Sequence, residues 1–323
     1  MDLVKNLYQR DKLEQKPTRD GYGHGLVELG KKNKNIVVLG ADLTSSTRSD
    51  WFRDEFPDRF IQCGIAEQNM ICLAVGLALS GKIPFASTYS VFCPGRNWDQ
   101  IRVSVAYNKA NVKFTGAHAG ISVGPDGATH QGLEDIAITR CLPNMTVLAP
   151  CDMIETQKAT IAAGLMNGPV YLRFAREATQ IFTTDKTPFK IGEAQVFRKG
   201  KDVSVIACGP IVYEALLAAE ELSKEGIDVR VINNPSIKPI DEETIIEAAE
   251  QTGAIVTGED HQVIGGLGSA VAEVLGKYSP VPMEMVGVQD RFGESGQQDE
   301  LMKEFGLTSE DIKKAIRKVI KRK

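Results

Sequence analysis

The sequence predicts an α/β protein built from two doubly wound domains, each with a largely parallel sheet covered by helices on both faces. Short apolar runs alternate with helix-length segments from residue 21 to residue 173, and the same alternation starts again at residue 203. A polar stretch without periodicity, residues 176–193, separates the two series. A chain of 323 residues is long enough for two cores. We therefore expect a first domain over residues 1–190 and a smaller one over residues 191–323.

The first domain is expected to hold six buried strands, because it contains six short apolar runs with helix-length segments between them. The strands are expected at residues 36–39, 60–62, 85–88, 112–115, 146–148 and 170–173. The helices are expected at residues 21–34, 67–79, 97–108, 134–141 and 152–166. The helix over residues 67–79 is apolar on every side, so we expect it to be buried.

The second domain repeats the pattern with fewer elements. Its strands are expected at residues 203–207, 228–232, 254–256 and 282–285, and its helices at residues 212–224, 242–251 and 267–276. Residues 313–323 combine seven Lys and Arg residues with apolar residues at helical spacing. We interpret this tail as an amphipathic closing helix with a solvated outer face, and a partner-binding tail is the alternative.

Composition excludes several classes of function. A net charge of −4 does not indicate a nucleic-acid-binding protein. The longest apolar run, residues 70–79, is far shorter than the ~20 residues that cross a bilayer, and the first residues show no apolar signal core. We therefore expect a cytoplasmic protein without a membrane partner. The 6 cysteines form no C-x-x-C pair, which favours reduced core thiols over disulfides or a metal site.

Residues 116–132 are the most informative segment. They follow an expected strand and hold His118, His130 and Asp126 among several glycines. Histidine changes charge near neutral pH, and glycine lets a backbone pass close to a ligand. Ligand sites of parallel α/β sheets gather where strands end. We interpret the segment as a ligand-binding loop, and the alternative is a long surface turn with two incidental histidines.

Two further segments stand at the ends of expected strands. Glu67 begins the apolar helix, where a carboxylate is stabilised by the helix dipole. A buried carboxylate at that place also requires a partner or a raised pKa. Tyr89 and Phe92 follow another strand and either form a flat stacking surface or pack in the core. The glycines of residues 265–268 are interpreted as tight packing at a helix start rather than as a phosphate cradle.

The order of these segments closely resembles the pyrimidine-binding domain of transketolases, enzymes that depend on thiamine diphosphate. The resemblance rests on G-I-x-E at residues 64–67, S-T-aromatic-x-x-Phe at 87–92, H-x-G-I-x-x-G-x-D-G-x-T-H-Q at 118–131 and Pro-Asn-Met at 143–145. Residues 190–323 look like the C-terminal domain of the same family, with less specific motifs. The resemblance therefore covers nearly the whole chain and implies ketol transfer between sugar phosphates.

The resemblance implies a cofactor role for four residues. In that family a glutamate bonds the aminopyrimidine ring of thiamine diphosphate and favours its imino tautomer, and Glu67 matches this glutamate. Tyr89 and Phe92 match the aromatic residues that pack on the pyrimidine ring, and Asp42 matches an aspartate near the cofactor. The chemistry requires a carboxyl group shielded from water, which the apolar helix behind Glu67 is expected to provide.

The resemblance also implies a substrate role for six residues. His118 and His130 resemble the family's substrate-facing histidines, suited to proton transfers near neutral pH, and Asp126 resembles an aspartate that bonds a substrate hydroxyl. The positions that match those holding the substrate phosphate are Arg19, Ser46 and Arg176. A guanidinium suits phosphate because its donors form a planar fork.

One part of the family pattern is missing from this chain. Relatives grip the diphosphate and Mg²⁺ through a G-D-G motif followed by an Asn pair, and the sequence contains no such segment. The chain therefore resembles the C-terminal half of a split transketolase and is expected to supply no metal ligand. We expect an N-terminal transketolase subunit as a separate chain, with a homodimer contact inside a heterotetramer.

Other functions remain open on the same residues. A 1-deoxyxylulose-5-phosphate synthase fragment or the beta subunit of a 2-oxoacid dehydrogenase shares the glutamate and the fold. The pairing of His118 and His130 with Asp126 favours ketose chemistry over oxoacid decarboxylation. A regulatory homologue without activity is the non-enzymatic alternative, and the presence of all these residues with Glu67 argues against it.

Overall fold

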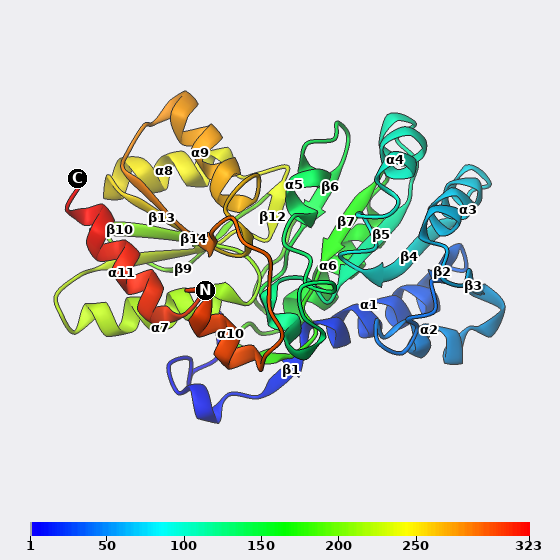
Figure 1. Cartoon of the computed structure of the whole chain (residues 1–323), viewed down its shortest axis with the longest axis horizontal. Helices are drawn as coiled ribbons and strands as arrows, with labels where there is room; N and C mark the ends of the chain where they lie inside the picture. The colour runs from blue at the N-terminus through cyan, green and yellow to red at the C-terminus, as the bar shows by residue number, and fades with distance from the viewer. Residues whose placement is uncertain (1) are drawn as a thin grey trace.

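The computed structural model describes residues 2–323 and contains two large sheets that lie side by side, each with helices packed against it (Figure 1). The first sheet is seven-stranded and the second is five-stranded. A small antiparallel pair joins β1 (Gln15–Pro17) to β8 (Ala178–Gln180). The predicted α/β class with two doubly wound units is confirmed.

All six strands expected in the first half are present. They are β2 (Ile36–Gly40), β3 (Phe60–Gln62), β4 (Ile83–Tyr89), β5 (Lys113–Ala117), β6 (Thr146–Leu148) and β7 (Val170–Arg173). They pair in parallel in the order β6-β7-β5-β4-β2-β3. The strands β2, β5, β6 and β7 are buried along their whole length, which explains why their sequences are short apolar runs rather than alternating patterns.

The seventh strand of this sheet comes from the second half of the chain. The strand β12 (Ser236–Lys238) pairs antiparallel with β6 at the sheet edge. This segment has one isoleucine between a serine and a lysine, so no apolar run marks it as a strand in the sequence. The expected division at residue 190 falls between β8 and β9 (Gln195–Arg198). That division remains a prediction, because the chain returns to the first sheet at β12.

The helices α1 (Thr18–Lys32) and α6 (Met153–Leu165) pack against each other on one side of the first sheet (Figure 1). Glycine permits this close packing, since a Cβ added at Gly21 would lie 2.0 Å from the carbonyl oxygen of Met153. The remaining helices of this half include α2 (Ser49–Glu55), α3 (Glu67–Leu79) and α5 (Asp135–Arg140).

Two expected elements differ in detail from the structure. The helix expected over residues 97–108 is one turn of α-helix, α4 (Trp98–Gln100), followed by a π-helix, η3 (Ile101–Tyr107). The segment 116–132 begins in β5 and contains the 3₁₀-helix η4 (Ile121–Asp126), which is interrupted at Gly124, where φ is 79°. Such local changes of helix type are set by side-chain packing rather than by periodicity.

The expectation that α3 is buried on every side is wrong for this chain. Leu73 is 38% exposed, Leu79 is 75% exposed, and Ile65 just before the helix is 73% exposed. The neighbouring π-helix exposes Val103 and Tyr107 in the same way. The helix is apolar all round because one side packs on the sheet and the other side forms an exposed apolar surface. We call these five residues the apolar face.

The second sheet has the order β14-β13-β10-β11-β9, parallel except for its antiparallel edge strand β9. Its other strands are β10 (Val203–Ala207), β11 (Val229–Asn233), β13 (Ile255–Gln262) and β14 (Met283–Val288). Its helices are α7 (Ile211–Ser223), α8 (Glu242–Thr252), α9 (Leu267–Tyr278), α10 (Gln298–Glu304) and α11 (Ser309–Ile320).

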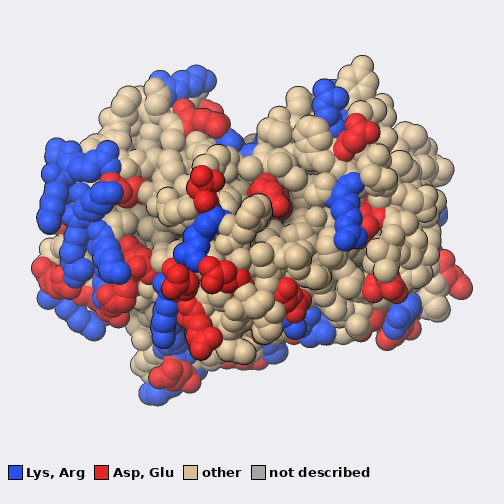
Figure 2. Space-filling view, in the orientation of Figure 1, with Lys and Arg blue, Asp and Glu red and all other residues tan. Residues whose placement is uncertain are grey.

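The closing helix α11 is amphipathic. Ile312, Ile316 and Val319 are fully buried against the second sheet, and the basic residues face outward except for Lys313, which is buried. Figure 2 shows Lys and Arg gathered over this helix with acidic side chains among them, and Arg317 forms an ion pair with Glu225 at 2.8 Å. None of the helices formed by residues 2–323 combines the length and apolar character required for a bilayer crossing.

Candidate functional site

The residues singled out from the sequence gather along one edge of the first sheet. Asp42 follows β2, Glu67 follows β3, Tyr89 ends β4, His118 follows β5 and Arg176 follows β7. These strands are parallel neighbours, so their carboxyl ends meet at the same edge. This edge is where open α/β sheets bind ligands.

Glu67 is the first residue of α3 and only 4% exposed. Arg96 donates a hydrogen bond to Glu67 Oε1 at 3.0 Å, and the side chain of Asn97 donates to the Glu67 backbone carbonyl. Within residues 2–323, Oε2 accepts no hydrogen bond. The Arg96 side chain is 49% exposed, so the carboxylate is shielded from water yet remains reachable from the side of Arg96.

A row of flat groups runs from this carboxylate to the histidines. The Arg96 guanidinium carbon lies 3.9 Å from the centroid of the Phe92 ring, and Phe92 stacks on Tyr89 with centroids 5.8 Å apart. Tyr89 in turn stacks on His118 at 3.9 Å. His130 meets Phe92 edge-on at 5.6 Å. Aromatic pairs prefer such offset and edge-on arrangements, and these four rings form one packed cluster next to the carboxylate.

His118 is 1% exposed and adopts a left-handed backbone conformation with φ of 55°. Its Nε2 lies 3.5 Å from Arg19 Nη1, which assigns the ring proton to Nδ1. Within residues 2–323, Nδ1 has no hydrogen-bond partner. Burial, with the nearby charges of Arg19 and Arg176, lowers the pKa of His118 to about 2. The ring is therefore a neutral hydrogen-bond donor rather than an acid that titrates near neutral pH.

Positive charge surrounds this histidine. Arg19 in α1 donates to the Ser46 backbone carbonyl at 2.9 Å, and burial together with the charge of Arg48 lowers its pKa. Arg176 forms an ion pair with Asp126 at 3.1 Å and donates to the Val123 carbonyl. The guanidinium groups near His118 suit an anionic ligand.

The structure brings together most of the expected site residues. Arg19, His118, Tyr89, Phe92 and His130 are joined by contacts, and Glu67 joins them through Arg96. Arg176 and Asp126 are paired with each other, and the charge of Arg176 helps to lower the pKa of His118. Ser46 takes part through its backbone carbonyl. Asp42 is exposed, and its backbone amide donates to Gln62 Oε1.

Sequence reasoning missed Arg96 and Arg48. Arg96 follows Phe92 by four residues and could have been noted as a cation beside an aromatic residue. Its partner Glu67 is 29 residues away, and no local pattern connects the two. Arg48 is paired with Asp20 at 2.6 Å and is brought to the site by the start of α2.

The glycines at residues 265–268 do not form a ligand cradle. The buried carboxylate of Glu259 accepts hydrogen bonds from the backbone amides of Leu267 and Gly268, both at 2.7 Å. A Cβ added at Gly266 would lie 2.0 Å from Glu259 Oε2. The helix start is thus capped by the protein's own carboxylate, in agreement with the interpretation as tight packing.

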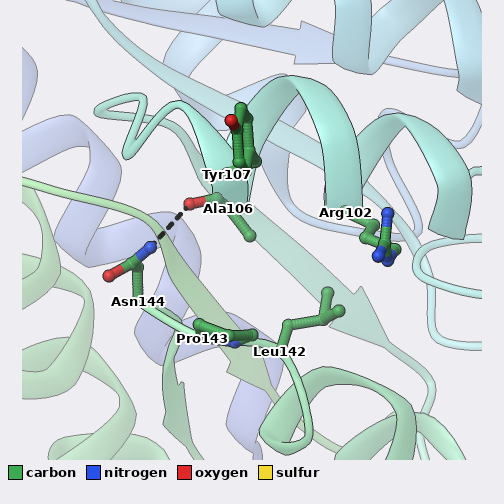
Figure 3. Close-up of a pocket in the computed structure, with 6 residues that line it drawn as sticks. All are labelled: Arg102, Ala106, Tyr107, Leu142, Pro143 and Asn144. Carbon is green, nitrogen blue, oxygen red and sulfur yellow. Dashed lines mark hydrogen bonds between the residues drawn. The ribbon is translucent and has the colours of Figure 1, made fainter.

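An apolar cavity of about 140 Å³ lies beside the π-helix and away from the residues described above (Figure 3). Its lining residues are Arg102, Ala106, Tyr107, Leu142, Pro143 and Asn144. The side chain of Asn144 donates to the Ala106 carbonyl across it at 3.0 Å. No group of three or more His, Cys, Asp and Glu side chains suited to a metal ion occurs in residues 2–323.

Comparison with known families identifies both halves of the chain. Residues 14–181 match the pyrimidine binding domain of transketolase, and residues 192–312 match the transketolase C-terminal domain. The chain belongs to the transketolase family. The resemblance deduced from the sequence motifs is confirmed, and the chain corresponds to the C-terminal section of proteins in which transketolase is split.

Several relatives share this length. A putative transketolase C-terminal section of Methanocaldococcus jannaschii is 47% identical over 95% of this chain and 97% of its own. A 6-deoxy-6-sulfo-D-fructose transketolase subunit of Clostridium is 44% identical over 97% of each chain. Human transketolase is 40% identical over 94% of this chain but only 49% of its own length. In such single-chain transketolases this chain matches about half of the protein.

Solved transketolase structures have the same fold. One is a split gene transketolase described as an inactive beta4 tetramer, with a TM-score of 0.89 and 47% identity over 94% of this chain and 98% of that one. The transketolase of Campylobacter jejuni has a TM-score of 0.81 and 25% identity, and covers 96% of this chain with 48% of its own.

Proposed function

We propose that this chain is the C-terminal subunit of a thiamine-diphosphate-dependent transketolase that moves a two-carbon ketol unit from a ketose phosphate to an aldose phosphate. The observation that carries the proposal is the position of Glu67, a buried carboxylate linked through Arg96 to the row of Phe92, Tyr89 and His118. A buried carboxylate beside aromatic rings suits an aminopyrimidine ring, which needs a hydrogen-bond partner and an apolar contact.

The residues present fit the cofactor. Glu67 Oε2 accepts no hydrogen bond from residues 2–323 and so can bind a ring nitrogen, and Tyr89 and Phe92 are the aromatic residues that we assign to packing against the ring. Asp42, at the end of β2, is the fourth residue assigned to the cofactor. When bound, thiamine diphosphate supplies the carbon nucleophile for the ketose carbonyl. The part of this chain is to hold a proton between the Glu67 carboxylate and the ring in a site that excludes water.

At the other end of the row, the residues fit an anionic sugar. His118 Nδ1 is a buried donor without a partner among residues 2–323, so it is ready to hydrogen-bond a substrate oxygen. His130 is half-buried and is the histidine that we assign to proton transfer. Asp126 is assigned to a substrate hydroxyl, while Arg19, Arg176 and the Ser46 segment are assigned to the phosphate.

The names of two relatives indicate further kinds of ketose that could serve as donors of the ketol unit. One is named for 6-deoxy-6-sulfo-D-fructose, and another, from Phocaeicola vulgatus, is named as part of an apulose-4-phosphate transketolase. Both substrates carry an anionic group on a ketose. The arginines around His118 are suited to such a group, whichever acid it is.

The proposal includes a separate N-terminal subunit that provides the diphosphate and Mg²⁺ sites. The apolar face supports an assembly, because an exposed apolar surface of this kind marks a protein interface. The relative described as an inactive beta4 tetramer supports an assembly of this kind. We assign the apolar face to contacts in a heterotetramer of two copies of each subunit.

The test is reconstitution. The chain is co-expressed with a polypeptide that carries the G-D-G motif, and ketol transfer from xylulose 5-phosphate to ribose 5-phosphate is measured with thiamine diphosphate and Mg²⁺. We expect activity from the complex and none from the isolated chain. A complex that binds thiamine diphosphate but transfers no ketol unit from any ketose phosphate would show that the proposal is wrong.

The role of Glu67 is tested in the same complex. Glu67→Gln is expected to slow hydrogen–deuterium exchange at the reactive carbon of the cofactor by about a hundredfold or more, because the amide cannot take up the proton. Glu242→Gln is the matched control, since Glu242 also lies in the first turn of a helix but is exposed and lies on α8, beside the second sheet. Exchange at the normal rate in Glu67→Gln would remove Glu67 from this role.

A further inference from the structure

The segment that carries His118, Asp126 and His130 is held from outside by the second half of the chain. We propose that Asp260, on β13 of the second sheet, is a positioning residue that fixes this segment and thereby sets the geometry of substrate binding. The substrate role rests on the function proposed above. The contacts between Asp260 and the segment are a property of the folded chain, so their effect on the segment can be measured without an activity assay.

Both oxygens of the Asp260 side chain accept hydrogen bonds from backbone amides of the segment. Asp260 is 5% exposed, and its Oδ1 accepts a hydrogen bond from the Ile121 amide at 2.8 Å. Its Oδ2 accepts a longer one from the Ser122 amide at 3.4 Å. Gly120 has φ of 85°, and a Cβ there would lie 2.1 Å from Oδ2. The carboxylate therefore requires glycine beside it, two residues after His118.

A buried ion pair supports Asp260 from behind. Arg173 at the end of β7 donates to the Asp260 backbone carbonyl at 2.5 Å and to Asp135 Oδ2 at 2.9 Å. Tyr171 also donates to Asp135 Oδ2, at 2.6 Å. All of these side chains are buried, so each has lost its water and depends on its partners. The network links the first sheet to the strand that carries Asp260.

A second set of contacts fixes the other end of the segment. Gln131 is 3% exposed and its Nε2 donates to the Ile121 carbonyl at 3.2 Å and to the Glu294 carbonyl at 2.9 Å. Gly127, with φ of 74°, packs against Ser295, whose Oγ would lie 2.4 Å from an added Cβ. The loop after β14 thus covers the segment next to His130.

These contacts define what the second half contributes to the site. His118 lies just before the amides that Asp260 binds, and His130 lies just before Gln131. A loop held at both ends keeps the two rings in place against Tyr89 and Phe92. Enzyme sites lose efficiency when supporting groups of this kind are removed, even though those groups touch no substrate.

The experiment uses the full chain. In Asp260→Asn, hydrogen–deuterium exchange of the amides of residues 119–132 is expected to be at least about tenfold faster, because hydrogen bonds to a charged acceptor are lost. In the assembled complex, the KM for the ketose phosphate is expected to rise about tenfold, with exchange at the reactive carbon of the cofactor unchanged. The matched control is Asp241→Asn. Asp241 also accepts hydrogen bonds from two backbone amides, those of Thr244 and Ala194, but it lies away from the segment.

The outcomes separate the possibilities. Equal exchange in Asp260→Asn and the wild type overturns the proposal, and so does faster exchange with an unchanged KM in an active complex. A rise in KM with Asp241→Asn as well would show a general loss of stability and also overturn it. If Asp260→Asn does not fold, Gln131→Ala loosens the other end without leaving a buried charge, and the same readouts apply. If the wild-type complex transfers no ketol unit, the proposed function fails. Hydrogen–deuterium exchange of the segment's amides then decides by itself whether Asp260 fixes the segment.

Discussion

His118 shows how a site can change the chemistry of a residue type. A free imidazole titrates near neutral pH, which is why two histidines beside an aspartate indicated proton transfer. In the structure the ring is buried beneath Tyr89 and faces Arg19, and the positive charge and lost water keep it neutral. His118 is thereby suited to donate a hydrogen bond, and the half-buried His130 is left as the residue for proton transfer.

The low pKa of His118 predicts a pH dependence of stability. The unfolded chain takes up a proton at the ordinary pKa of 6.5, whereas the folded chain does not until about 2, so the free energy of unfolding falls as the pH drops below 6.5. Between pH 7 and pH 5 this residue alone is expected to remove about 2 kcal/mol. His118→Phe is expected to lose that much less stability over the same range, measured by denaturant unfolding.

The matched control for this measurement is His24→Phe, in which an exposed ring that packs on Trp51 is replaced. The comparison between variants isolates His118, because the buried His261 also has a pKa lowered by burial, to about 4, and contributes equally to every protein compared. An identical loss of stability in His118→Phe and the wild type would contradict the assignment of a buried neutral ring.

Arg176 is the residue to test for phosphate recognition. Removing a guanidinium that binds phosphate loses a charged hydrogen bond, so Arg176→Ala is expected to raise KM for phosphorylated ketoses roughly tenfold to hundredfold. KM for an unphosphorylated ketose is expected to change little. Arg53→Ala, at an exposed arginine of α2, is the control. Equal effects on both kinds of substrate would mean that Arg176 does not bind the phosphate.

At the level of single residues, the sequence predicted side chains that the structure brings to one edge of the sheet, but not how they are paired. Glu67, Tyr89 and His118 follow strands, and the parallel order of the sheet brings them to one edge. The pairing of Glu67 with Arg96 depends on how α3 packs beside a loop that comes 29 residues later. Contacts of that range leave no local pattern.

Among the elements, the buried parallel strands were the most predictable, because a strand covered on both faces must be apolar throughout. The edge strands β9 and β12 lack that requirement and were missed. The apolar helix α3 was predicted as a helix but with the wrong surroundings, since periodicity cannot distinguish a helix buried on every side from one that exposes an apolar side.

The apolar face predicts an effect on association. Leu73→Asp places a charge in the middle of the proposed interface, and the isolated chain is expected to shift from an oligomer to a monomer in analytical ultracentrifugation. Leu165→Asp is the control, because Leu165 is also an exposed leucine, 79% exposed, at the end of α6. An unchanged oligomer in Leu73→Asp would place the interface elsewhere.

For the whole molecule, the proposed division of the cofactor site between two chains predicts a binding result. The isolated chain offers Glu67 and the aromatic surface but has no G-D-G segment, so it is expected to bind thiamine diphosphate weakly. Calorimetry is expected to show tight, Mg²⁺-dependent binding only after the partner is added. Tight Mg²⁺-dependent binding by this chain alone would contradict the division.

The crossing of β12 has a consequence for attempts to dissect the protein. A fragment that ends near residue 190 loses the strand that pairs with β6, and the backbone groups on that side of β6 become an open template for other chains. Such a fragment is expected to form insoluble aggregates even though it contains every side chain assigned to substrate and cofactor. The second half of the chain thus covers an edge of the first sheet and protects it from edge-to-edge association with other chains.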